Sequence, residues 1–583
     1  MIKLLKKLNR KAIIFCILSL IFTVFEVMFA LAIPKYMTNI TDIIQTYDSD
    51  LPKTLFVGLK MLLCAFGNLF FAIASTLIVS NIFNDFAAKL RSDLFKKVQS
   101  FSMVEIGFFT TTSLLTRSTN DVAQVQNFLV TCLMAVIKAP ILITWAIIKM
   151  TDSQWQWSVI MAIALLVLVV ALIYLLLVAE PKFKKLQMLT DNLNLNMREN
   201  ISGIRVVRAY NAEHYHESKF DISNENLTNT NLFAMHAVAF FSPVLQLVIS
   251  SASLAIYWIG ALMINVVKLH SEKIIMFSQM MVFSQYAVQM LGSFMMFWVL
   301  SMIMPSALVS SRRILEVLET PISIKDGKIL QCDSLHRGEI EFKNVSFRYP
   351  NTNVDVLSDI SFSAKKGETV ALIGSTGCGK TSIVNLIPRF YDVTNGKILV
   401  GGIDVREYKQ DKLREMIGYV SQEAFLISGT IGENIAYGKD LNKESILNAI
   451  SIAQGNEIIE RSAEGIYSYV AQRGTNFSGG QKQRISIARA VYKNPEILIF
   501  DDSFSALDYM TDKKLRMELN KFFVDSTKII VAQRIGTIMD ADRIIVLDNG
   551  QIAGIGTHMD LMHNCEIYRQ IAYSQLSKKE LLS

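Results

Sequence analysis

Long apolar runs dominate the first half of the chain. A helix crosses a bilayer with about 20 apolar residues, and six stretches meet this length. They cover approximately residues 12–35, 55–82, 126–149, 157–178, 236–264 and 274–304. The first run begins beside basic residues, but no small-residue cleavage site follows it and further spans do, so we predict a retained helix and not a signal peptide. The pattern predicts a transmembrane domain over residues 1–320.

The polar segments between the runs alternate in length and charge. The short ones are 36–54, 150–156 and 265–273. They are poor in Arg, and the first carries Asp42, Asp48 and Asp50. The long ones, 83–125 and 179–235, are rich in Lys and Arg. Because cytoplasmic segments carry the excess of Lys and Arg, we place these long segments and both termini in the cytoplasm, and we expect a bacterial cell membrane.

The long cytoplasmic segments have the character of helices. No proline occurs between Pro52 and Pro140 or between Pro181 and Pro243. A helix from about residue 55 to 99 would be roughly 65–70 Å long at 1.5 Å per residue, well beyond the ~30 Å bilayer core. We therefore predict two helical hairpins that project into the cytosol. Their tips are expected near Phe108–Ser113 and Arg208–Glu213.

Two charged residues fall inside predicted spans, Glu26 in the first and Lys138 in the third. A charge at the bilayer centre costs about 2.5–3.5 kcal/mol on insertion scales, so each should face protein or water. Glu26 either contacts a cationic substrate or takes part in a structural hydrogen bond or ion pair, and we favour the structural role. The sixth span is rich in methionine, which suits promiscuous apolar surfaces but is also ordinary span filler.

After residue 320 the pattern changes to short apolar strands separated by glycine-rich turns. A polar linker is predicted over 321–338, and a second domain over 339–583. Ile340–Tyr349 alternates like a strand, and Thr369–Ile373 is apolar throughout, as in a strand of a parallel sheet.

Composition argues against nucleic-acid binding and against a cysteine-based disulfide or metal framework. The chain is 51% hydrophobic with a net charge of +7, and much of the positive charge lies beside apolar spans, so we expect no nucleic-acid partner. The six cysteines are scattered without paired spacing, which indicates neither a disulfide framework nor a cysteine metal site.

The central motif is Gly374-Ser375-Thr376-Gly377-Cys378-Gly379-Lys380-Thr381, which fits the phosphate-binding P-loop pattern. It follows the predicted strand and precedes a predicted helix that starts with Ser382. Glycines let several backbone N–H groups point at one triphosphate. Lys380 can reach the β- and γ-phosphates, and the Thr381 hydroxyl can ligate Mg²⁺. We predict that this loop binds ATP.

Other residues add groups for the same chemistry. Tyr349 lies about 25 residues before the P-loop, where its ring can stack on adenine, and Gln422 ends an apolar strand, where it can ligate Mg²⁺ or position water. Phe477-Ser478-Gly479-Gly480-Gln481 opens a helical run, and the free N–H groups of a helix start attract phosphate. Asp501 ends a buried strand and can ligate Mg²⁺, and Asp502 follows it.

Together, GSTGCGKT, VSQ, FSGGQ, ILIFDD and SALD, in this order and spacing, resemble an ABC exporter half-transporter over essentially the whole chain. The resemblance implies an all-α six-helix transmembrane domain of the type IV exporter fold, fused to an α/β P-loop nucleotide-binding domain with an antiparallel β subdomain. It also implies that two chains pair head to tail. Each ATP, with Mg²⁺, is then held between one P-loop and the Ser-Gly-Gly-Gln of the other chain.

Two catalytic positions depart from the family pattern. The family's general base is a Glu directly after the strand-ending Asp, where this chain has Asp502, and the family's switch histidine is replaced by Gln533. Asp is one methylene shorter than Glu, and a misplacement near 1 Å can cost about 10²-fold in rate. Gln can hydrogen-bond a phosphate but carries no positive charge. We therefore expect both changes to be compatible with ATP binding and to weaken hydrolysis.

One weakened site and one intact signature in a single chain resemble the degenerate subunit of a heterodimeric exporter. The alternative is a slow homodimer in which Asp502 still acts as base. We expect an ATPase-coupled exporter of amphipathic or hydrophobic compounds, of the multidrug type, that works with a second half-transporter. Export of a peptide or lipid, siderophore-type import on the same fold, and an ATP-gated channel or sensor remain open alternatives.

Overall fold

The computed structural model describes the whole chain except residues 8, 46–50, 151–153, 331–335, 351 and 577–583. Asp48 and Asp50, which the sequence analysis names, therefore lie outside the described residues, as does one of the six cysteines, Cys332. The chain divides into two compact units. The first comprises residues 1–99 and 111–320, and the second comprises 100–110 and 321–583.

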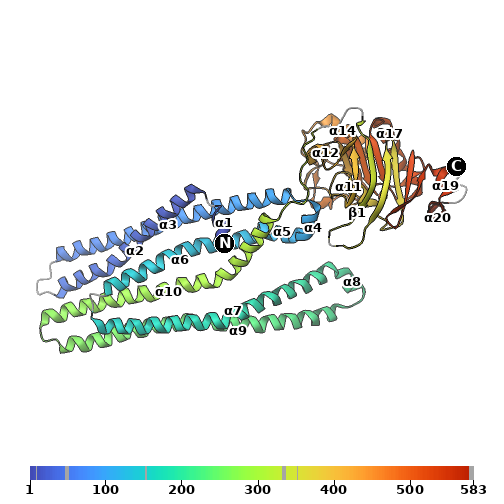
Figure 1. Cartoon of the computed structure of the whole chain (residues 1–583). Helices are drawn as coiled ribbons and strands as arrows, with labels where there is room; N and C mark the ends of the chain where they lie inside the picture. The colour runs from blue at the N-terminus through green and yellow to red at the C-terminus, as the bar shows by residue number, and fades with distance from the viewer. Residues whose placement is uncertain (8, 46–50, 151–153, 331–335, 351, 577–583) are drawn as a thin grey trace. The chain divides into compact units, whose positions relative to one another are not determined.

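The first unit is helical (Figure 1). Its helices are α1 (Ile2–Leu5), α2 (Arg10–Gln45), α3 (Leu51–Gln99), α5 (Thr111–Ser118), α6 (Asn120–Met150), α7 (Trp155–Ser202), α8 (Ile204–Ala209), α9 (Glu213–Val266) and α10 (His270–Glu319). Among the described residues, 6 helices are long and apolar enough to cross a membrane, which confirms the predicted number of spans. Their outward faces carry many exposed Leu, Ile and Phe side chains, as a lipid-facing surface requires.

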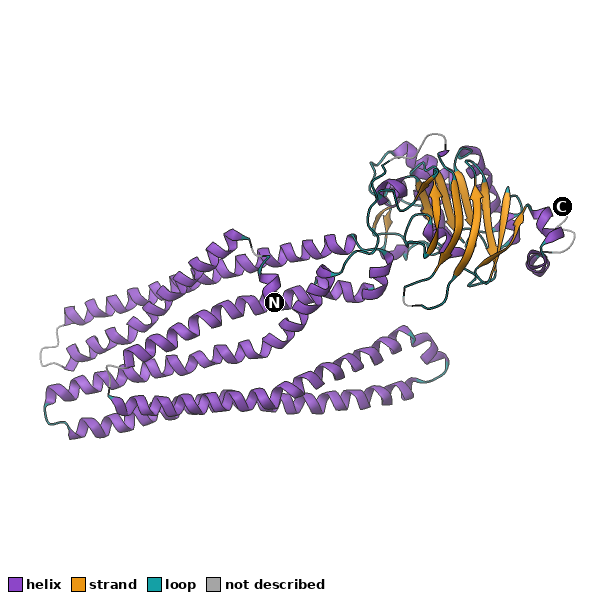
Figure 2. Ribbon diagram, in the orientation of Figure 1, coloured by secondary structure: helices purple, strands orange, loops and turns teal. Residues whose placement is uncertain are grey.

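The long helices and the hairpins are confirmed. Helix α3 has 49 residues and is therefore about 74 Å long. The second hairpin consists of α7 and α9, with the short helix α8 at its tip, where Arg208–Glu213 is predicted (Figure 2). The tip of the first hairpin is a short helix as well, α4 (Met103–Phe109), followed by a turn at Thr110.

Glu26 and Lys138 meet, although 112 positions separate them in the chain. The Lys138 ammonium donates to a Glu26 carboxylate oxygen and forms an ion pair with it. Glu26 is buried, with 6% of its surface exposed. The structural ion pair favoured from the sequence is therefore present, and each charge compensates the other inside the span.

In its described residues, the second unit contains three sheets, whose strands are orange in Figure 2. The largest has six strands in the order β12 (Gln551–Gly556), β11 (Arg543–Asp548), β3 (Thr369–Gly374), β10 (Thr527–Val531), β9 (Ile497–Asp501), β6 (Ile417–Val420). All pairings are parallel except β11–β12. Strands β9 and β10 are buried at every position, which fits the apolar runs Ile497–Phe500 and Ile529–Val531 in the sequence.

The predicted antiparallel β subdomain is present. Its strands lie in the order β2 (Leu357–Ala364), β1 (Ile340–Phe347), β4 (Asn395–Val400), β5 (Ile403–Asp404). A two-stranded pair, β7 (Gly429–Thr430) and β8 (Tyr469–Val470), completes the sheets. Strand β1 ends at Phe347, two residues before the predicted end, because the chain turns at Tyr349, whose carbonyl accepts the Thr352 N–H.

Helices surround the parallel sheet. They are α11 (Lys380–Leu386), α12 (Gln410–Glu415), α13 (Ile431–Ala436), α14 (Lys443–Ile452), α15 (Asn456–Glu460), α16 (Gly479–Tyr492), α17 (Tyr509–Phe522), α18 (Ile535–Ile538), α19 (His558–Asn564) and α20 (Glu566–Gln575). Two apolar clusters form the core, one with α13, α14 and α16 on the sheet, the other between the sheet, α11 and the antiparallel strands.

Part of the predicted linker packs onto the second unit. Ile324 is buried, with 4% of its surface exposed. The N–H groups of Gly327 and Ile329 donate to the carbonyls of Tyr408 and Glu407. These contacts could not be predicted from the side-chain composition of the segment, because they are made largely by its backbone.

Candidate nucleotide-binding site

The P-loop runs from strand β3 into helix α11, as predicted. Gly374 and Gly379 have φ angles of 156° and 101°, a region that favours glycine. A Cβ at Gly374 would meet the Leu547 carbonyl oxygen at 2.1 Å, and one at Gly379 would meet the Leu357 side chain at 2.5 Å. Both positions therefore admit only glycine. The absence of a side chain lets the P-loop backbone lie close to Leu547 of β11 and Leu357 of β2.

Within the loop, Lys380 is held by backbone carbonyls. Its ammonium donates to the carbonyl oxygens of Gly374 and Ser375, both at 2.8 Å, and only 8% of the residue is exposed. Ser375, Thr376 and Gly377 are exposed. The lysine is thus fixed beneath the part of the loop that is open to a phosphate.

Two residues flank the start of α11 on the side of the antiparallel strands. The Tyr349 hydroxyl and the Ser382 hydroxyl lie 3.0 Å apart. The Tyr349 ring packs edge-on against Phe347 and Tyr391. This ring therefore lies beside the P-loop helix, and its stacking on adenine stays a prediction.

Asp501 faces Thr381. The Thr381 hydroxyl donates to one Asp501 oxygen at 3.0 Å, and the Tyr419 hydroxyl approaches the other at 3.5 Å. Only 2% of Asp501 is exposed, and burial raises its pKa, helped by the neighbouring charge of Asp502. A bound cation would offset this cost of burying a carboxylate. The donor set, a buried carboxylate beside a hydroxyl, suits Mg²⁺.

Asp502 is contacted by the two glutamines singled out by the sequence. The Gln533 side-chain amide donates to an Asp502 oxygen at 2.8 Å, and that of Gln422 lies 3.5 Å from the same oxygen. Burial raises the pKa of Asp502, and the charge of Lys380 opposes this rise. The Asp502 backbone has a φ of 48°, and its N–H donates to the Val531 carbonyl of the neighbouring strand. Its position is therefore fixed by the β9–β10 pairing.

The Ser478–Gln481 motif starts helix α16. The Ser478 hydroxyl accepts the Gln481 N–H at 3.3 Å, and the Gln481 side chain accepts the Ser478 N–H at 2.9 Å, which forms a capping box. Ser478 and Gly479 are exposed. In the described part of the chain, the hydrogen bonds of Ser478 and Gln481 stay within this helix start, so the structure does not join the motif to its own P-loop.

Sequence reasoning missed Tyr419, a residue of the site. Tyr419 contacts Asp501, and its hydroxyl also donates to the Asn385 side chain of α11 at 3.0 Å. Tyr419 precedes Val420 in strand β6, and no motif marks it. Only the pairing of β6 with β9, which sets Tyr419 beside Ile499, reveals the contact.

Comparison with known proteins decides the family. The model described as "ABC transporter transmembrane region" matches residues 16–294, and that described as "ABC transporter" matches residues 357–505. An uncharacterized ABC transporter ATP-binding protein of Mycobacterium tuberculosis is 38% identical over 86% of each chain. The chain belongs to the ABC transporter family. It is a half-transporter, with one membrane domain fused to one nucleotide-binding domain.

Other relatives agree with this assignment. The transporter is 36% identical to an uncharacterized ABC transporter ATP-binding protein of Bacillus subtilis over 90% of this chain and 89% of the relative. It is 33% identical to a putative multidrug export ATP-binding/permease protein of the same organism, over 83% and 82%. The solved structure of a bacterial Atm1-family ABC exporter with ATP bound has the same fold, with a TM-score of 0.80, 23% identity and coverage of 98% and 99%.

The family assignment confirms several expectations at once. The chain is a multi-pass membrane protein with a cytoplasmic nucleotide-binding domain, and it binds ATP and couples ATPase activity to transport. Because a half-transporter supplies only one of the two nucleotide-binding domains, it acts as a dimer in the bilayer.

Proposed function

We propose that this chain is the degenerate subunit of a heterodimeric exporter, meaning that its own site binds ATP but hydrolyses it poorly. The supporting observation is the 2.8 Å contact between the Gln533 amide and Asp502. A hydrogen bond donated to a carboxylate stabilises its charged form and makes it a weaker base. The Gln533 amide donates such a bond to Asp502. Gln533 also lacks the positive charge of the family's His, and Asp502 lacks the reach of the family's Glu.

In this proposal each ATP is shared between two chains. The P-loop of this chain, with Lys380 and Ser382, holds one nucleotide, and the Tyr349 ring stacks on its adenine. Thr381, Gln422 and Asp501 hold Mg²⁺, which neutralises charge on the phosphates when bound. Ser478, Gly479, Gly480 and Gln481 complete the partner's site, where hydrolysis mainly takes place. The exposure of Ser478 and Gly479 supports this role, because the motif is accessible to a second chain.

The proposed substrates are amphipathic or hydrophobic compounds, moved outward. Two observations support this class. A relative with 33% identity is named a putative multidrug exporter. Helix α10 carries buried Met280 and Met290 and exposed Met295, Met302 and Met304, and methionine adapts to ligands of varied shape.

The pairing is tested by ATPase measurement on the purified chain. Alone, the chain is expected to hydrolyse ATP slowly, and co-expression with its partner half-transporter should restore turnover. Detergent-purified and lipid-reconstituted samples are compared at saturating ATP. Turnover of about 1 s⁻¹ or more by the pure chain, an ordinary enzyme rate, would support the homodimer instead.

A further prediction concerns the ion pair in the membrane. Glu26→Gln leaves the Lys138 charge uncompensated, and breaking a buried pair in this way costs about 3–5 kcal/mol. We expect a lower yield of folded protein and an equal loss of transport for cationic and neutral compounds. The double variant Glu26→Gln/Lys138→Met removes both charges and should recover the yield. Selective loss of cation transport, with normal yield, would instead assign Glu26 to the substrate.

A further inference from the structure

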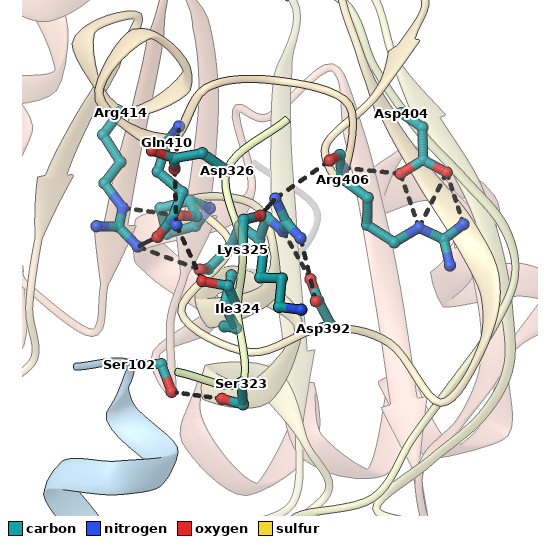
Figure 3. A network of polar contacts seen from close by, with 12 residues as sticks. Ser102, Ser323, Ile324, Lys325, Asp326, Asp392, Asp404, Arg406, Gln410 and Arg414 are labelled. Carbon is teal, nitrogen blue, oxygen red and sulfur yellow. Dashed lines mark hydrogen bonds and ion pairs between the residues drawn. The ribbon is translucent and has the colours of Figure 1, made fainter. Parts of the chain in front are cut away.

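Helix α4 is fastened to the first residues of the predicted linker through Glu105. One Glu105 oxygen accepts the Ser102 N–H at 2.7 Å and caps α4 itself, while the other accepts the Ser323 N–H at 3.0 Å. The hydroxyls of Ser102 and Ser323 lie 3.0 Å apart (Figure 3). Only 5% of Glu105 is exposed, and although burial alone would raise its pKa, these hydrogen bonds lower it. Glu105 therefore stays charged and bound to both partners.

The next residues, 323–326, which we call the strap, are bound to helix α12. The Gln410 side-chain amide donates to the Asp326 carboxylate at 2.9 Å and lies 3.4 Å from the Ile324 carbonyl (Figure 3). The backbone N–H of Gln410 is 3.3 Å from the same carboxylate. With Ile324 buried, the strap has little freedom to move apart from the domain.

Arg389 joins the strap to the segment that follows the P-loop helix. Its guanidinium donates to the Lys325 carbonyl at 3.0 Å and to the Arg406 carbonyl at 3.2 Å. The same group forms two hydrogen bonds with Asp392, at 2.7 and 3.2 Å. Only 4% of Arg389 is exposed, so losing a partner would leave a buried donor unsatisfied.

Arg389 is itself attached to the end of α11. Its backbone N–H donates to the Leu386 carbonyl at 3.1 Å, and the Phe390 N–H donates to that of Asn385. Arg414 holds the same turn from the other side, because its guanidinium donates to the carbonyls of Pro388 and Arg389. Helix α11 has only seven residues and begins with Lys380 and Thr381, so about two helical turns separate these residues from the turn at Arg389.

We propose that the strap couples the nucleotide state of α11 to α4 within one chain, with Glu105 and Arg389 as the positioning residues at its two ends. Helix α4 lies in the sequence between α3 and α5 of the membrane unit. The contacts therefore form a continuous polar route from the P-loop helix to the tip of the first hairpin. The proposal rests on ATP binding at the P-loop and not on the heterodimer, so the two can fail separately.

The test measures hydrogen–deuterium exchange of α4 amides in the full-length chain in lipid nanodiscs, with and without saturating ATP and Mg²⁺. Coupled sites typically influence each other about 5- to 150-fold. We expect ATP to slow exchange in residues 103–109 about fivefold or more in the unmodified chain. Glu105→Ala should remove most of this response while binding of a fluorescent ATP analogue is retained.

Matched variants separate coupling from folding. Ser323→Ala keeps the backbone N–H that Glu105 accepts and should keep the response, and Glu105→Gln keeps acceptor oxygen and should restore much of it. Arg389→Lys retains the charge but loses the forked contact with Asp392, so it should weaken the response from the other end. Lys412→Ala, in an exposed pair with Glu415, is the surface control.

Two results would overturn the proposal. One is an unmodified chain that binds ATP without any change of exchange in α4. The other is a Glu105→Ala chain that binds ATP and shows the full response, because the strap would then be only a structural attachment. Non-additive effects of Glu105→Ala and Arg389→Lys in the double variant are expected if both act on one route.

Discussion

Ser478→Arg is expected to abolish nearly all ATP hydrolysis by the complex of this chain with its partner. Ser478 is exposed at the start of α16, and its hydroxyl caps that helix. In the proposed arrangement this helix start meets the γ-phosphate held by the partner's P-loop. An arginine there places bulk where the phosphate must lie. The measurement is steady-state ATPase of the co-purified complex at saturating ATP.

Two variants serve as controls for Ser478→Arg. Ser478→Ala removes the hydroxyl, whose loss as a helix cap costs about 0.5–2 kcal/mol of stability, but it adds no bulk at the proposed phosphate position. Its ATPase rate should therefore fall less than that of Ser478→Arg. Asp502→Ala should lower the ATPase rate of the complex only slightly, because it removes a poorly placed base from the degenerate site. Lys380→Ala should give an ATPase rate between those of Asp502→Ala and Ser478→Arg, because it acts through ATP affinity. If Asp502→Ala is as damaging as Ser478→Arg, the degenerate-site proposal is wrong.

The second large effect is a gain of activity. Asp502→Glu with Gln533→His should raise the ATPase rate of the purified chain alone by about 10²-fold, the size of the penalty for a misplacement near 1 Å. The longer carboxylate reaches further from β9, and removing the Gln533 amide frees the oxygen that it occupies at 2.8 Å. The intact Ser478–Gln481 motif of a second copy would then complete each site.

The rate is measured together with the oligomeric state. Asp502→Glu alone should give a partial gain and Gln533→His alone little, because each single variant leaves one defect in place. Adding Lys380→Ala to the double variant should remove the gain, which excludes a contaminating ATPase. A dimeric double variant that hydrolyses ATP no faster than the unmodified chain would show that these two positions do not limit the rate.

Much of this protein could be predicted from local sequence patterns. Six spans, the long cytoplasmic helices, the strand–loop–helix of the P-loop and the strand ending at Asp501 all depend on residues close together in the chain. An apolar run of sufficient length must enter the membrane, and a glycine-rich turn between strand and helix orients its own N–H groups. The two departures at Asp502 and Gln533 were visible for the same reason, since each occupies a fixed place beside a strand.

Contacts between distant segments were decided by the tertiary structure. Lys138 faces Glu26 because α6 packs beside α2, Tyr419 approaches Asp501 because β6 pairs with β9, and Ser323 meets Glu105 across 218 positions. Several of these contacts use backbone groups, which every residue type carries, so composition gives no sign of them. Local sequence patterns determined which elements form and where the P-loop lies between its strand and its helix. Packing alone determined that a polar segment after the last span became a strap between α4 and the P-loop helix.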